Sequence, residues 1–134
     1  MHAQSASTRT GGCACGAVRF VAYGAPERCG LCHCLTCQKA HAAAFFPFVV
    51  FRSEQVKLVG DTVRWDSSQG YQRLFCPACG SRIASLNREE IELSIGSFDD
   101  PAGLEPQYES WITRRLPWVV ALPVAQYRQN RPDR

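Results

Sequence analysis

Four cysteines fall within nine residues in the first third of the chain, and this cluster limits what the sequence can fold into. They are Cys29, Cys32, Cys34 and Cys37, and the last three form a C-x-C-x-x-C motif. Core packing does not explain thiols at this spacing. Thiols so close in sequence either bind a soft cation such as zinc or carry out redox chemistry.

Two further cysteine pairs flank this cluster, and they predict a structural metal site. Cys13 and Cys15 lie upstream, Cys76 and Cys79 lie downstream, and a glycine follows each pair. A C-x-x-C knuckle gives two ligands to one zinc ion, and a distant two-ligand segment usually supplies the others. We therefore expect these four thiols to form one closed site. A closed site has no free coordination position, so its expected role is structural.

The remaining thiols allow three interpretations. Cys32, Cys34 and Cys37 would give a metal three ligands and leave one position open, as in a catalytic zinc site. Alternatively, Cys29 is a fourth ligand that closes this site as well. Thirdly, two of the thiols form a disulfide when metal is lost. His33 is a candidate ligand or proton shuttle, or it points outward from the loop.

Length and composition exclude several classes of protein. A chain of 134 residues with a hydrophobic fraction of 46% is expected to form one packed domain. No apolar run approaches the roughly 18 residues of a membrane helix, and the N-terminus has no signal-peptide pattern. We therefore expect a cytoplasmic protein with reduced thiols and no membrane partner. The net charge is +3, and several arginines near the C-terminus contribute to it. This mild charge does not favour nucleic-acid binding.

Short apolar segments separated by turn residues predict a mainly β fold. Strands are expected at 17–23, 45–51, 56–59, 63–65, 71–75, 82–86, 91–95 and 118–122. Pro47 favours an edge strand or a bulge. The thiol cluster is expected in a loop, and 36–43 in one or two helical turns. We divide the chain into a disordered tail (1–10), a zinc domain (11–125) and an arginine-rich tail (126–134).

Several other side chains are candidates for a role beside the thiols. Arg64, Arg73 and Arg82 would contact the carboxylates of an anionic ligand, or they are exposed solubilising residues. His41 is expected on the surface of the short helix. The phenylalanines between residues 45 and 51 are expected in the core, with one or two of them as possible walls of a pocket.

Four segments together resemble the glutathione-dependent formaldehyde-activating family, which includes centromere protein V. These segments are 12–20 (GCACGAVRF), 32–40 (CHCLTCQKA), 75–81 (FCPACGS) and 96–101 (GSFDDP). Their order and spacing are similar to those of the family from about residue 11 to the C-terminal tail. The sequence departs from the pattern at Cys29, an additional thiol, and at Ala42, where the family usually has glycine. The added methyl group is either tolerated or narrows the approach to the metal.

The resemblance implies a two-sheet, zinc-stapled β architecture of the Mss4-like type with two zinc ions. The structural ion would be held by Cys13, Cys15, Cys76 and Cys79, and the catalytic ion by the C-x-C-x-x-C thiols, Cys32, Cys34 and Cys37. It also implies a carbon–sulfur lyase activity, in which glutathione and formaldehyde combine to S-(hydroxymethyl)glutathione. The implied partners are a small thiol and a small aldehyde.

We therefore hypothesise an enzyme that binds glutathione as a thiolate and adds it to an aldehyde, with His33 or water as the proton donor. The alternative is a non-catalytic binding module with two structural zinc ions, in which the second site is closed. A weaker third hypothesis is thiol-based redox chemistry, which would form a disulfide during turnover.

Overall fold

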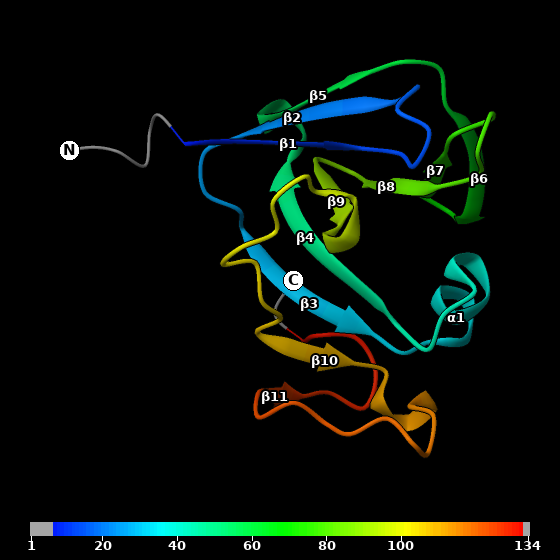
Figure 1. Ribbon diagram of the computed structural model, residues 1–134. Helices are drawn as coiled ribbons and strands as arrows, with labels where there is room; N and C mark the ends of the chain where they lie inside the picture. Colours follow the sequence, from blue (N-terminus) through cyan, green and yellow to red (C-terminus); the bar gives the residue numbers. More distant parts are fainter. Residues whose placement is uncertain (1–6, 133–134) are drawn as a thin grey trace.

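The computed structural model describes residues 7–132, and in this range the chain forms two β-sheets and one short α-helix (Figure 1). The smaller sheet has the strand order β1-β2-β5, with β1 (Thr8–Gly12), β2 (Arg19–Tyr23) and β5 (Val56–Val59). The predicted mainly β fold with two sheets is thus confirmed. The predicted strand pattern is confirmed for 17–23 and 56–59, and these two segments pair with each other.

The larger sheet has eight strands in the order β11-β10-β3-β4-β9-β8-β7-β6. All neighbours are antiparallel except β10, which runs parallel to both β3 and β11. The strands are β3 (Arg28–Cys32), β4 (Phe46–Arg52), β6 (Val63–Ser68), β7 (Tyr71–Phe75), β8 (Arg82–Asn87), β9 (Glu90–Ser94), β10 (Tyr108–Ser110) and β11 (Ala125–Gln126). The predicted hairpin of residues 82–95 is confirmed as β8 and β9.

The helical elements connect the strands. Helix α1 (Leu35–His41) follows the thiol cluster and confirms the predicted helical turns. Three short 3-10 helices are η1 (Ser53–Gln55), η2 (Ile95–Ser97) and η3 (Ile112–Arg114). In Figure 1, α1 lies where β3 ends and β4 begins.

The sequence-based predictions for the thiol cluster and for residues 118–122 were wrong. The first part of the thiol cluster is β3 rather than a loop, because its backbone pairs with β4 and β10. Residues 118–122 form no strand; Trp118 and Val120 are 73% and 85% exposed, so no buried sheet position stabilises an extended pairing there. The chain pairs instead through β10 and β11, which are too short to give an alternating pattern.

The predicted disordered tail covered residues 1–10. Residues 1–6 lie outside the described residues, but Thr8–Gly12 form β1, so the prediction was wrong for this part. The sequence of this segment has no apolar pattern that would predict a strand. Main-chain pairing with β2 and polar contacts hold the strand in place instead. The Thr10 hydroxyl donates to Asp99 Oδ2 at 2.7 Å, and Asp99 also pairs with Arg19.

Pro47 lies within an interior strand, which corrects the expectation of an edge or bulge. Strand β4 pairs with β3 on one side and with β9 on the other. However, the pairing with β9 begins only at Phe48, and Pro47 pairs with Leu31 of β3 alone. The missing N–H of proline is tolerated because this end of β4 has no β9 neighbour.

Strand β4 separates two hydrophobic clusters. Val49 and Phe51 face the cluster shared with the small sheet, whereas Phe46, Phe48 and Val50 face the cluster that contains Cys37 and Tyr108. Alternate residues of a strand point to opposite faces, so a single strand can serve both clusters. The second cluster positions the thiol motif.

Ala42 ends helix α1 in the left-handed conformation, with φ 48° and ψ 48°. Glycine adopts this conformation without strain, whereas a Cβ atom makes it cost about 1–2 kcal/mol. A glycine at this position, as is usual in the family that the sequence resembles, would therefore allow the left-handed backbone conformation without strain. Ala42 does not line the cavity that contains the thiol motif, so its methyl group does not narrow the approach to that site.

Replacing Ala42 with glycine is expected to stabilise the domain by about 1 kcal/mol, because the strain at the helix end is removed. Urea unfolding at constant zinc concentration measures this change. The control is Ala43→Gly, one residue further along and without positive φ, which is expected to give no stabilisation. Equal effects of the two substitutions would contradict the role of the left-handed conformation.

Candidate metal centres and the adjoining cavity

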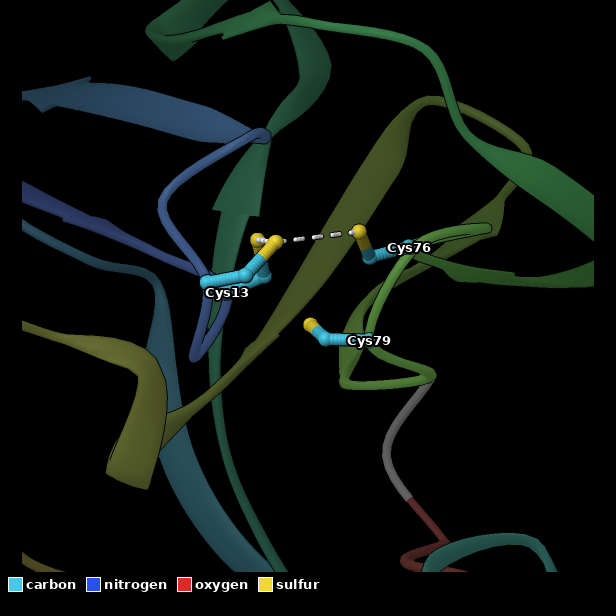
Figure 2. A group of neighbouring side chains, drawn as sticks. Cys13, Cys76 and Cys79 are labelled. Carbon is cyan, nitrogen blue, oxygen red and sulfur yellow. Dashed lines mark hydrogen bonds between the residues drawn. The ribbon is translucent and has the colours of Figure 1, made fainter.

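The first thiol cluster joins the turn after β1 to the turn between β7 and β8 (Figure 2). The Sγ atoms of Cys13, Cys15, Cys76 and Cys79 lie within 4.8 Å of one another. Two of the Sγ–Sγ distances are 3.6 Å, between Cys13 and Cys15, and 3.8 Å, between Cys15 and Cys76. A tetrahedral zinc ion with Zn–S bonds of about 2.3 Å places its sulfur ligands about 3.8 Å apart. The donor set and its spacing therefore fit zinc.

The two turns present their sulfur atoms to backbone N–H groups. The N–H of Val18 donates to Cys13 Sγ at 3.2 Å, and the N–H of Ala78 donates to Cys76 Sγ at 3.3 Å. These donors stabilise negative charge on sulfur. The hydrogen bond from Val18 lowers the pKa of Cys13, and hydrogen bonds from Ser81 lower the pKa of Cys79 to about 5. Cys13 and Cys79 are thereby favoured as thiolates, the form of the side chain that binds a cation.

The second thiol cluster lies where β3 passes into α1. Cys32 is the last residue of β3, Cys34 is the N-cap of α1, and Cys37 lies in its first turn. Their Sγ atoms also lie within 4.8 Å of one another, and no other His, Cys, Asp or Glu of residues 7–132 joins the group. Hydrogen bonds with Cys32 and Cys37 lower the pKa of Cys34 to about 2. The three sulfur atoms also fit a soft cation.

The structure does not bring Cys29 to this group. Cys29 and Cys32 are three positions apart on β3, so their side chains point to opposite faces of the sheet. Cys29 is buried in the hydrophobic cluster with Val49, while Cys32 packs against the other cluster. Burial raises the pKa of Cys29, as expected of a thiol within an apolar core. The reading in which Cys29 closes the second site lacks geometric support.

His33 neither joins the thiols nor points outward. Its side chain is fully buried, and its Nε2 lies 2.6 Å from Oε1 of Glu109 on β10. Burial of Glu109 acts to raise its pKa, but hydrogen bonds from His33, the N–H of Leu122 and Gln126 lower it to about 2. Glu109 was missed because a carboxylate in a three-residue strand gives no sequence signal. This pair holds the C-terminal segment against β3.

A cavity of about 370 Å³ adjoins the second thiol cluster. All three clustered thiols line it, together with the aromatic rings of Phe46 and Phe48. Its volume is within the range of small-molecule sites. The expectation that one or two of the phenylalanines form pocket walls agrees with this arrangement.

Only one of the three arginines proposed from the sequence lines the cavity. Arg73 is 5% exposed, and both of its terminal nitrogens lie 3.8 Å from Cys37 Sγ. Arg64 instead contacts Gln72, and Arg82 donates to the carbonyl of Leu74.

Two arginines that the sequence analysis did not single out also line the cavity, namely Arg28 on β3 and Arg131 near the C-terminus. Their positions depend on the fold, because they are 103 residues apart in the chain. The predicted arginine-rich tail thus contributes to the cavity wall.

His41 is half-buried rather than fully on the surface. Its ring stacks on Phe46, with the ring centroids 4.0 Å apart. Burial and the nearby charges of Arg82 and Arg73 lower its pKa to about 3. The residue does not line the cavity beside the thiols, so it packs the end of α1 against β4.

A mainly β fold with a four-thiol cluster, and a three-thiol cluster beside a cavity, defines a small thiol-rich protein of the metal-binding type. The chain belongs to the family described as glutathione-dependent formaldehyde-activating enzyme, whose sequence model matches residues 8–114. The resemblance seen in the sequence is thus confirmed.

Solved structures support the fold. A crystal structure of a Rhodobacter sphaeroides protein, determined as a structural genomics target, is similar with a TM-score of 0.56. The two chains are 16% identical, and the match covers 88% of this chain and 98% of the other. The comparison with curated proteins gave no match. Residues 7–132 contain no helix with the length and apolar character that a membrane crossing requires.

Proposed function

We propose that this protein binds a small thiol, glutathione in particular, beside Cys32, Cys34 and Cys37 and adds its sulfur to a small aldehyde such as formaldehyde. The observation that carries this proposal is the convergence of three sulfur atoms, without a fourth ligand among the described residues, at the wall of a cavity. Family membership supports the reaction class, a carbon–sulfur lyase working in the direction of addition. The proposal includes two zinc ions per chain and a reducing, cytoplasmic location, where the thiols stay available as ligands.

Zinc at the three thiols would lower the pKa of a bound thiol, so that the substrate is a thiolate at neutral pH. The chain's own residues supply charge and shape. The guanidinium of Arg73, beside Cys37 Sγ, offsets the negative charge that gathers among the sulfur atoms. Phe46 and Phe48 give part of the cavity an apolar wall.

Arg28 and Arg131 are suited to bind the carboxylates of glutathione. The Nε atoms of both side chains are buried and have no hydrogen-bond partner among the described residues. The terminal nitrogens of Arg28 already bind Glu90, at 3.1 Å and 2.9 Å. A buried donor without a partner costs about 1–3 kcal/mol. A ligand carboxylate would remove this cost, which favours an acidic thiol over a neutral one.

Replacing Arg131 with glutamine is expected to weaken glutathione binding at least about tenfold, because a charge-assisted hydrogen bond is worth about 1.5–3 kcal/mol. Calorimetric titration of the zinc-loaded variant measures this change. Arg128→Gln is the matched control, since Arg128 belongs to the same segment but does not line the cavity. If both variants bind like the unmodified protein, Arg131 does not contact the substrate.

The proposed function as a whole is tested by titrating glutathione into zinc-loaded protein and comparing it with an analogue that has an alkyl side chain in place of the cysteine. We expect binding that depends on the thiol, followed by turnover with formaldehyde. Absence of binding by both compounds would contradict the proposal. It would favour the non-catalytic module, although that alternative requires a fourth ligand that residues 7–132 do not supply.

A further inference from the structure

A row of polar side chains crosses the centre of the large sheet. The strand registers align Arg28 with Val50, Val50 with Glu92, Glu92 with Ser85, and Ser85 with Arg73. Partner residues on neighbouring strands lie on the same face. Four of these five residues are polar, and Ser85 and Glu92 are buried. Buried polar groups are costly unless they form hydrogen bonds or ion pairs, so the partners of this row decide its role.

Tyr71 connects the row to the thiols. It lies two residues before Arg73 on β7, so both side chains are on the same face. Its hydroxyl donates to Oε1 of Glu92. The guanidinium of Arg73 lies 4.8 Å from the centroid of the Tyr71 ring and also contacts Cys37 Sγ. Tyr71, Glu92 and the three thiols line the same cavity.

Glu92 is placed to exchange a proton with Tyr71. Burial is the largest influence on Glu92 and raises the pKa of its carboxyl group. Glu90 acts in the same direction, whereas the Tyr71 hydroxyl, Arg28 and Arg73 act to lower the pKa of this group. With a raised pKa, the carboxyl group holds a proton at a higher pH than an exposed glutamate does. The sequence offered His33 or water as the donor, but His33 is fully buried against Glu109 and, unlike Tyr71, does not line the cavity.

We propose that Tyr71 is the catalytic proton donor of the addition reaction and that Glu92 is the positioning residue that resupplies its proton. This inference rests on the proposed function. The substrate sulfur forms a bond with the carbonyl carbon, and the carbon–oxygen π bond breaks with its electron pair moving to oxygen. The Tyr71 hydroxyl gives its proton to that oxygen, and Glu92 then gives its proton to the tyrosinate. The thiol released one proton to solvent when it bound, and solvent returns one proton to Glu92, so the reaction balances.

The test compares turnover with thiol binding in zinc-loaded protein. Tyr71→Phe is expected to lower kcat with formaldehyde about 100-fold, the lower end of what a general acid contributes, because burial raises the pKa of the Tyr71 hydroxyl and makes it a weaker acid. Its affinity for glutathione, measured by calorimetry, is expected to stay within about twofold, since the proton moves only after the thiol has bound. Glu92→Gln keeps a hydrogen-bonding partner for Tyr71 but no transferable proton, and is expected to lower kcat about tenfold. Tyr23→Phe, on the small sheet and 47% exposed, is the matched control with unchanged kcat.

The outcomes separate this inference from the function on which it rests. If Tyr71→Phe keeps the kcat of the unmodified protein, the assignment of Tyr71 is wrong and the proposed function stands. If the substitution lowers glutathione affinity and thermal stability together with kcat, Tyr71 is structural, which also overturns the assignment. If the unmodified protein binds glutathione but has no turnover with aldehydes, the proposed function fails and the role of Tyr71 fails with it.

Discussion

Cys76→Ser is expected to leave the domain unfolded at 25 °C. Cys76 is fully buried and belongs both to the four-thiol cluster and to the larger hydrophobic cluster. A structural zinc site contributes about 10–16 kcal/mol to folding in small metal domains. The whole stability of a domain is only about 5–15 kcal/mol, so loss of this site exceeds what the remaining contacts supply. Circular dichroism and zinc analysis of the purified variant measure the effect.

Cys29→Ala is the control for this experiment. Cys29 is also buried, but it lies outside both thiol clusters. We expect the variant to fold, to keep the zinc content of the unmodified protein and to lose only about 1 kcal/mol of stability through the smaller side chain. Loss of one zinc ion from Cys29→Ala would show that the second site is closed. A fully folded Cys76→Ser variant would show that the four-thiol cluster does not staple the fold.

Cys34→Ser is expected to abolish thiol-dependent turnover while the fold persists. Cys34 is the N-cap of α1, and its sulfur accepts a hydrogen bond from the N–H of Cys37 at 3.4 Å. Serine is among the most favourable N-cap residues, so the helix end stays intact. The same substitution removes a metal ligand. Even outer-shell partners of a metal are worth about 10- to 100-fold in activity, so we expect a loss of at least about 100-fold.

The measurements for Cys34→Ser are the rate with glutathione and formaldehyde, thermal unfolding and zinc content. We expect unfolding close to that of the unmodified protein and loss of one zinc ion of two. Thr36→Ser is a matched control, because Thr36 lines the same cavity but offers no sulfur ligand. Full activity of Cys34→Ser would refute a role for this metal site in the reaction.

The grouping of the thiols could be predicted from the sequence, because ligand spacing is a local property. The Cys13–Cys15 and Cys76–Cys79 pairs each need two partners, and the chain offers only a few ways to supply them. The position of Cys29 could not be predicted. It depends on the extended conformation of β3, which places this side chain on the face opposite to that of Cys32, and the sequence RCGLC shows no alternation of polar and apolar residues.

The cavity wall depends on strand register, which the sequence does not display. Arg28, Glu92 and Arg73 come together only because β3, β4, β9, β8 and β7 align across the sheet. A shift of one residue in any pairing would turn such side chains to the other face. For the same reason, the sequence could not distinguish Arg73, which lines the cavity beside the thiols, from Arg64 and Arg82, which do not.

The two thiol clusters differ in the length of the chain segment that separates their ligands, and this difference sets the order in which they would bind metal. Cys32, Cys34 and Cys37 span six residues, whereas Cys15 and Cys76 are 61 positions apart. Closing a long loop costs more chain entropy than closing a short one, and it requires the intervening strands to be synthesised and paired. During synthesis on the ribosome, the local motif can capture zinc long before the distant pairs meet. The site proposed for chemistry would load first, and the site that staples the fold would load last.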